Sequence, residues 1–147
     1  MPSTYSFIQT VWLTGLNTRD WFHWETVYTT SSRELKVNLT TEFLVNLDGK
    51  HNICVFIAES GIVAPQQDEI TVIEDYVHNH VLRTSMNGTW GDAVGIDGTA
   101  VAGEENENSY SMTLDGEWVA ENCSVIAFVY HEDSRQIIQA EEAHVIE

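Results

Sequence analysis

The stretch "ELKVNLTTEFLVNLDGKHNICVFIAE", residues 34–59, decides the fold class of this chain. From Leu35 to Leu47 the odd positions carry apolar side chains or Thr, and the even positions are polar except for Leu44. Because successive side chains of a strand point to opposite faces, this period of two predicts a strand with one buried face. Residues 53–58 are apolar on both faces, which predicts a central strand whose second face is covered by another element or by loops of the chain.

Asp48-Gly49 separates the two runs and is a favoured pair for a two-residue type I′ turn. We therefore expect the two runs to form a β-hairpin whose register is set by that turn. The expected cross-strand pairs are Phe43 with Cys54, Thr41 with Phe56, and Leu39 with Ala58.

Strand patterns continue on both sides of this stretch. A second hairpin is expected near the C-terminus, where the apolar run 122–131 is followed by a polar turn and a returning strand. Weaker strand patterns cover residues 5–13, 23–30 and 109–114, whereas the Gly- and acid-rich residues 91–108 predict loop with a short strand at most. Seven to nine short strands with little helix predict an all-β fold, an antiparallel β-sandwich of immunoglobulin-like or jelly-roll-like topology. No repeat or linker divides residues 1–147, so we expect a single domain.

The charge of the chain excludes one class of partner. Six Lys and Arg residues stand against 23 Asp and Glu residues, which gives a net charge of −17. A protein that binds nucleic acid needs a basic face to displace counterions, and these six cations cannot form one. Anionic membrane surfaces are disfavoured for the same reason, and no apolar run is long enough to span a bilayer.

The two cysteines, Cys54 and Cys123, lie in separate apolar runs. Zinc sites built on cysteine need close pairs, so this spacing does not predict one. The residues leave open whether the two thiols form a disulfide, but free thiols in the core are favoured. No nucleophile motif and no phosphate-binding glycine loop is found, so we expect neither an enzyme nor a cofactor.

Residues 74–92, "EDYVHNHVLRTSMNGTWGD", hold the densest unusual chemistry. We expect residues 70–86 to be extended rather than helical, and in a strand His78 and His80 point to the same face about 6.5–7 Å apart. They could then share a metal ion, although no third ligand is visible. The favoured alternative is that the histidines bond backbone carbonyls and that Arg83 pairs with Asp75 or another acid.

Five tryptophans are many for 147 residues. Exposed rings on a sandwich can stack against sugars, and "DWFHWE", residues 20–25, is the best candidate for such a platform. Burial in the core is the favoured alternative, because apolar residues flank this cluster.

Residues 35–143 resemble the C-terminal domain of the outer-membrane-protein-28-related lipoproteins of Gram-negative bacteria. The positions that carry the resemblance are Val63 to Gln67, Tyr76, His78, Asn79, His80, Val81, Leu82, Arg83, Gly88, Trp90, Gly91, Asn122, Ala127 to Tyr130, Gln139 and Ala140. The resemblance implies an exported lipoprotein with a preceding domain and an anchor that these residues do not include. It implies no catalytic residues, and a redox role does not carry over because neither cysteine lies in a Cys-x-x-Cys motif.

From the resemblance we expect a non-enzymatic binding or structural module at the outer membrane or cell surface, with an adhesin-like role as one form of that function. The expected partners are a protein or glycan ligand and the preceding domain of the parent protein, with membrane contact only through the anchor. The binding residues stay open, and the family-motif residues Tyr76, His78, Asn79, His80, Arg83 and Trp90 are the candidates. A carbohydrate-binding module and a metal-binding domain at His78 and His80 are the alternative functions.

Overall fold

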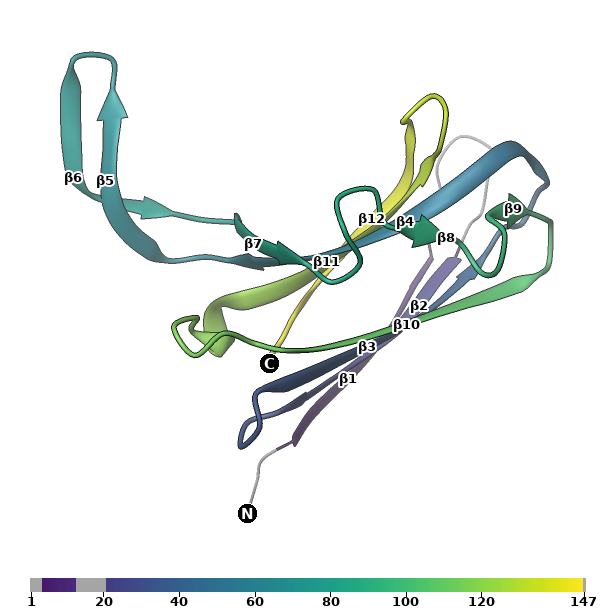
Figure 1. Ribbon diagram of the computed structural model, residues 1–147, viewed down its shortest axis with the longest axis horizontal. Coiled ribbons are helices and arrows are strands. Elements are labelled where there is room, and N and C mark those ends of the chain that lie inside the picture. Colours follow the sequence, from purple (N-terminus) through teal and green to yellow (C-terminus); the bar gives the residue numbers. More distant parts are fainter. Residues whose placement is uncertain (1–3, 13–20, 147) are drawn as a thin grey trace.

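A computed structural model describes the backbone of residues 4–12 and 21–146, and the side chains of Thr4 and residues 23–146. Figure 1 shows two layers of antiparallel strands, with a long hairpin that projects from one of them. In the first layer the order is β1-β2-β3-β10. Its strands are β1 Thr4–Trp12, β2 Trp21–Thr29, β3 Glu34–Glu42 and β10 Glu105–Thr113.

The second layer has the order β12-β11-β4-β7, with two short strands that also pair with β4. Its strands are β4 Leu47–Glu59, β7 Val81–Ser85, β8 Asp92–Ala93, β9 Thr99–Ala100, β11 Cys123–His131 and β12 Ile137–His144. One short 3-10 helix, η1 Ala120–Asn122, precedes β11. The described residues form twelve strands, more than the predicted seven to nine, and eight of them make up the two layers besides the short β8 and β9. The predicted β-sandwich is confirmed.

The core lies between the two layers. The predicted buried face of β3 is confirmed, because Leu35, Val37 and Leu39 are all buried. Alternate residues of β4 and β11 meet them from the other layer. β4 is also buried on its second face, where Cys54 and Ala58 point away from the core, as its apolar pattern predicts.

The predicted hairpin at Asp48-Gly49 is wrong. β3 pairs with β2 and β10, whereas β4 pairs with β11 and β7, so the two runs lie in different layers and the expected cross-strand pairs do not form. Residues 43–46 carry the chain across. Gly49, at φ +83°, lies inside β4 at a shift of register, and a Cβ there would be 2.3 Å from Nε2 of His131. Gly49 is therefore part of a β-bulge that packs against the His131 ring, and it does not form a hairpin turn.

The predicted C-terminal hairpin is confirmed, because β11 and β12 pair antiparallel. Residues 70–86 are extended in β6 and β7, also as predicted. Before β6 the chain turns back near Ile70, and β5 Ile62–Asp68 and β6 Thr71–His78 form a hairpin whose strands pair with each other and with no other described strand. We call residues 62–78 the arm (Figure 1).

Leu39→Ala tests the layer-to-layer core against a matched position outside it. Leu39 is 1% exposed and Leu82, on β7, is 60% exposed. We expect Leu39→Ala to lower the free energy of unfolding by about 2–5 kcal/mol through lost burial and a cavity. Leu82→Ala should lower it by less than about 1 kcal/mol. Urea denaturation of the two variants measures both values, and equal losses would contradict the assignment of the core.

Candidate functional site

The root of the arm is held by a buried carboxylate at the end of β4. Glu59 accepts a hydrogen bond from Nε of Arg83 at 2.7 Å, and its other oxygen accepts one from the backbone N–H of Val119 at 2.9 Å. Glu59 is 3% exposed, whereas the Arg83 side chain is 30% exposed. This confirms the expectation that Arg83 pairs with an acid, and Glu59 rather than Asp75 is that acid. The pair ties β7 and the segment before η1 to β4.

Two further residues of the predicted motif close the base of the arm. The backbone N–H of Gly61 donates to Oδ1 of Asn79 at 3.1 Å, and the backbone N–H of His80 donates to Oγ of Ser60 at 3.0 Å. These bonds join the chain entering the arm to the chain leaving it. His80 has φ +52°, a left-handed conformation that is uncommon for a residue with a side chain. The Ser60 bond supports this conformation.

The expected alignment of His78 and His80 is wrong, because His80 is in the left-handed region and breaks the strand between them. Nε2 of His78 lies 3.3 Å from the carbonyl oxygen of Ala64, and its ring packs on Tyr76 at 4.8 Å between centroids. Nε2 of His80 lies 3.3 Å from a carboxylate oxygen of Glu142. The two imidazoles therefore have separate partners. Among the described residues no group of three His, Cys, Asp or Glu could hold a metal ion.

Asn87 fastens the loop after β7 to the backbone edge of β4, between the residues that pair with β7 and those that pair with β8. Its Oδ1 accepts from the N–H of Val55 at 3.0 Å, and its Nδ2 donates to the carbonyl of Ile53 at 2.8 Å. Gly91 then approaches the same strand so closely that a Cβ would lie 2.0 Å from the carbonyl oxygen of Ile53. Both ends of the segment that carries Trp90 are thereby fixed on β4.

Trp90 is 63% exposed and forms one wall of a small pocket. The Tyr130 hydroxyl donates to the carbonyl of Trp90 at 2.5 Å. The Arg135 guanidinium carbon lies 4.5 Å from the centroid of the Trp90 ring and 5.8 Å from that of Tyr130, which is cation–π geometry. The pocket has a volume of about 160 Å³. Its other walls are Cys54, Thr89, Phe128 and Ile137.

Cys54 and Cys123 are free and buried, as favoured from their apolar runs. Burial, with a smaller contribution from Asp92, raises the pKa of the Cys54 thiol to about 11. Burial likewise raises the pKa of Cys123 to about 11, with smaller contributions from nearby charges. Both thiols are therefore neutral at physiological pH and poor nucleophiles.

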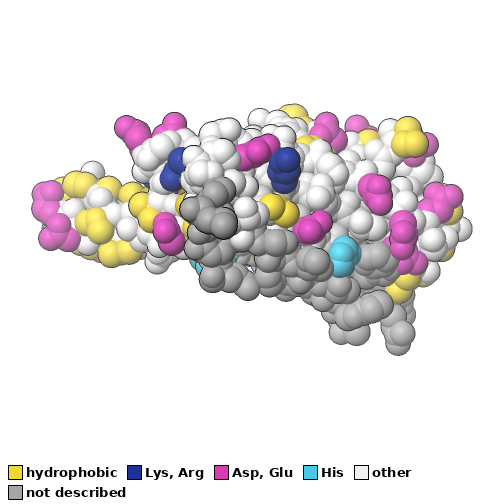
Figure 2. Space-filling view, turned by 90° about the horizontal axis from the view of Figure 1, so that it is seen from below, with side chains coloured by type: hydrophobic (Ala, Val, Ile, Leu, Met, Phe, Trp, Pro, Cys, Tyr) yellow, Lys and Arg dark blue, Asp and Glu magenta, His cyan; other side chains and the backbone are white. Residues whose placement is uncertain are grey.

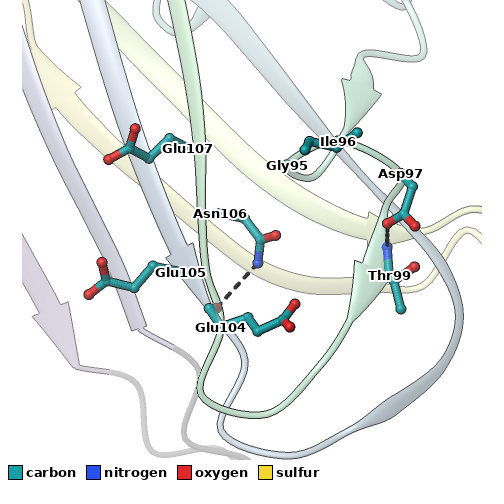
Figure 3. A pocket seen from close by; sticks show the side chains of 8 residues that line it. All are labelled: Gly95, Ile96, Asp97, Thr99, Glu104, Glu105, Asn106 and Glu107. Atoms are coloured by element: carbon teal, nitrogen blue, oxygen red, sulfur yellow. Dashed lines mark hydrogen bonds between the residues drawn. The ribbon is translucent and has the colours of Figure 1, made fainter.

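A wider groove lies between the β8–β9 loop and the start of β10, with a volume of about 640 Å³ (Figure 3). Figure 3 shows Glu105 and Glu107 on the side of β10 that faces away from the β8–β9 loop, whereas Glu104 and Asn106 lie on the side of that loop. Asp97 accepts a bond from the Thr99 N–H at 2.9 Å, and hydrogen bonds from Thr99 hold the pKa of Asp97 below its usual value. The groove is acidic, but its carboxylates do not form a cluster.

The tryptophans differ sharply in exposure. Trp24, in the candidate sugar platform, is 1% exposed and part of the core, which confirms the favoured alternative of burial for this ring. The side chains of Trp12 and Trp21 lie outside the described residues. Trp118 packs half-buried against the core. Within the described side chains Trp90 is therefore the one exposed tryptophan, and a sugar platform there stays a prediction.

The arm exposes more large apolar side chains than any other part of the described surface. Figure 2 shows hydrophobic side chains along it and acidic ones at its end. The exposed apolar residues are Val63, Ile70, Val72, Ile73, Tyr76 and Val77. Sequence patterns did not predict this exposure, because the same residues would also suit a strand covered by a second layer. No helix of the described residues is long and apolar enough to cross a membrane.

Glu59→Gln tests the ion pair at the arm root. The substitution keeps an acceptor for the Val119 N–H but leaves Arg83 without its charged partner. We expect a loss of about 1–3 kcal/mol of unfolding free energy, reduced by the partial exposure of Arg83. The control is Glu34→Gln, because Glu34 forms an exposed pair with Lys36 at 3.6 Å and should cost less than about 1 kcal/mol. Equal losses in chemical denaturation would contradict a special role for Glu59.

The thiols provide a test of burial. Because their pKa is raised from 9.0 to about 11, alkylation by iodoacetamide at pH 8 should be roughly 100-fold slower in the folded protein than in urea. The stabilisation from neutral thiols is complete below pH 9 and is lost as the pH rises towards 11. Mass spectrometry follows the modification of each cysteine. Rapid native labelling of Cys54 would show that the Trp90 loop leaves β4.

Comparison with known proteins places the fold in a family. The family model described as outer membrane protein Omp28 matches residues 24–147. The chain is also similar to a solved domain of the outer membrane lipoprotein Omp28 from Porphyromonas gingivalis, with a TM-score of 0.56 and 20% identity over 97% of this chain and 88% of that chain. At this identity the likeness shows a shared fold alone. A comparison with curated proteins finds no match. The family match confirms the resemblance stated from the sequence: the chain belongs to the Omp28 family, which is associated with the outer membrane of the cell envelope.

Proposed function

We propose that this domain is a non-enzymatic binding module of the cell envelope, adhesin-like in action, and that the arm is the element that contacts a partner protein. The observation that carries the proposal is the exposure of apolar side chains along a hairpin that no other described strand covers. A contiguous exposed apolar surface on a folded domain commonly marks an interaction site. No nucleic-acid partner is proposed, because the net charge is −17.

The register of the arm gathers valines on one face. Val63 lies opposite Val77, and Gln67 lies opposite Val72. Because Val63 and Gln67 are four residues apart on β5, they point to the same side, and the three valines share that side with Pro65. A two-stranded hairpin is only marginally stable in water by itself. A partner that covers this face would stabilise the arm and bury apolar surface in the same step.

The charge of the arm indicates the chemistry of its partner. Residues 62–78 carry Asp68, Glu69, Glu74 and Asp75 and no Lys or Arg. The complementary surface is an apolar cleft with a rim of Lys and Arg residues. A second copy of the chain is disfavoured as the partner, because it would bring another net charge of −17.

The root of the arm supports this role by limiting its motion. Glu59 and Arg83 anchor β7 next to the point where the arm ends, and Asn79 and Ser60 bridge its two ends. An element held in place before binding loses less conformational entropy when it binds. Ser60, Asn79 and Arg83 therefore support the apolar surface from its root, and the exposed arm residues form the contact.

Site-specific photo-cross-linking in cells that naturally produce the protein tests the proposal. A photo-reactive phenylalanine derivative replaces Val63 on the arm or, as a control, the fully exposed Ile96 on the sandwich. We expect adducts with a separate protein from position 63 and not from position 96. Their yield should fall as salt rises from about 0.05 to about 0.5 M, because charge complementarity is screened.

A second substitution tests whether the cross-link depends on apolar contact between the arm and its partner. With the cross-linker at position 63, Val77→Asp should reduce the adduct at least roughly tenfold, whereas Ile96→Asp should leave it unchanged. Adducts formed only with another copy of the chain, with another part of the same polypeptide, or with lipid would overturn the proposal. So would equal adducts from both positions, or none from either.

A further inference from the structure

One basic residue differs from the others in its surroundings. Lys36, Lys50 and Arg83 each pair with a carboxylate, at 3.6, 3.9 and 2.7 Å. The Arg33 guanidinium donates to backbone carbonyls of residues 114, 115 and 118. Within residues 23–146, Arg135 is the one Lys or Arg for which no hydrogen-bond or carboxylate partner of the side chain is found. In a chain with 23 acidic residues, an unpaired guanidinium is unexpected.

The fold holds Arg135 at the mouth of the Trp90 pocket. Arg135 ends the β11–β12 turn with φ +63°, and its backbone N–H donates to the carbonyl of His131 at 2.9 Å. The guanidinium lies over the Trp90 and Tyr130 rings, and among the described residues it forms no ion pair with the neighbouring Glu132 or Asp133. Stacking on the rings uses the face of the guanidinium and leaves its N–H donors available at the edge.

The pocket beneath this guanidinium is apolar and rigid. Trp90, Phe128 and Ile137 supply most of its walls, and the thiol of Cys54 is neutral. The Asn87 and Gly91 contacts fix the Trp90 segment on β4. A volume of about 160 Å³ is smaller than the pockets of roughly 300 Å³ or more that hold drug-sized ligands. It therefore suits one short chain or a single ring.

We propose that the Trp90–Arg135 pocket binds a small carboxylic acid, whose apolar body enters the pocket and whose carboxylate bonds the edge of the Arg135 guanidinium. This site is separate from the arm and does not rest on the proposed function. A monoanion suits it better than a phosphate, because the net charge of −17 opposes a more highly charged ligand. A sugar suits it less well, because Thr89 and Arg135 are the main polar groups on walls that are otherwise apolar or aromatic.

The test compares three ligands of the same length in an NMR titration of the whole chain: hexanoate, neutral hexanamide and cationic hexylamine. Hexanoate should bind with a Kd in the millimolar range, typical of a ligand of this size, and shift the signals of Trp90, Cys54 and Ile137. Hexanamide should bind about tenfold more weakly, because it lacks the charge-assisted bond. Hexylamine should not bind measurably.

Variants assign the effect to Arg135. Arg135→Gln should raise the Kd for hexanoate about tenfold and leave that for hexanamide unchanged. Lys50→Gln, which changes the net charge equally but lies outside the pocket, should have no effect. Should Arg135→Gln disturb the turn, as judged from the dispersion of its NMR spectrum, Arg135→Lys provides the comparison, since it keeps the charge and loses the planar fork.

Any of four outcomes would overturn the inference. Hexanoate and hexanamide could bind the natural chain equally, Arg135→Gln and Lys50→Gln could weaken hexanoate by the same factor, or the shifts could cluster away from Trp90. Absence of any shift up to about 50 mM hexanoate would overturn it as well, because that concentration far exceeds the expected Kd.

Discussion

Burial of β4 on both faces is the constraint on which the rest of the structure depends. One face supplies Ile53, Val55 and Ile57 to the core between the layers. The backbone edge of the same strand holds the loop that carries Trp90, through Asn87 and the close approach of Gly91. The strand ends at Glu59, whose carboxylate fixes the root of the arm. β4 therefore packs the core with its side chains and positions two surface features with its edge and its end.

The polar residues of the motif each form separate backbone contacts or ion pairs, and they do not come together in one common site. The contacts are hydrogen bonds with neighbouring segments, made by the Asn79 side chain, the His78 ring and the backbone N–H of His80. The His80 ring lies next to the carboxylate of Glu142. Such contacts lower the freedom of the arm without covering its valines. The root contacts therefore hold the arm in place with its apolar surface exposed, which is the arrangement that the proposed binding role requires.

The sequence predicted which residues are buried better than it predicted which strands are neighbours. Alternation from Leu35 to Leu47 identified the inner face of β3 correctly, because one buried face imposes a period of two whatever the partner strand is. The same period continues when the chain crosses from one layer to the other, since both layers face one core. Asp48-Gly49 could therefore be mistaken for a hairpin turn. The exposure of Trp90 and the burial of Trp24 follow from contacts distant in sequence, and so does the meeting of Cys54, Trp90 and Arg135 in one pocket.

The arm root and the Trp90 pocket lie on the same strand and are nevertheless separable. Cys54 and Glu59 are five residues apart on β4, so their positions differ by roughly 16 Å along the strand. An occupant of a 160 Å³ pocket does not reach across that distance. Substitutions on the arm should therefore leave the pocket intact, and Arg135 substitutions should leave the arm intact. When one surface is substituted, an unchanged response of the other shows that the fold is preserved. A substitution that abolishes the function of both surfaces would indicate that β4 itself is disturbed.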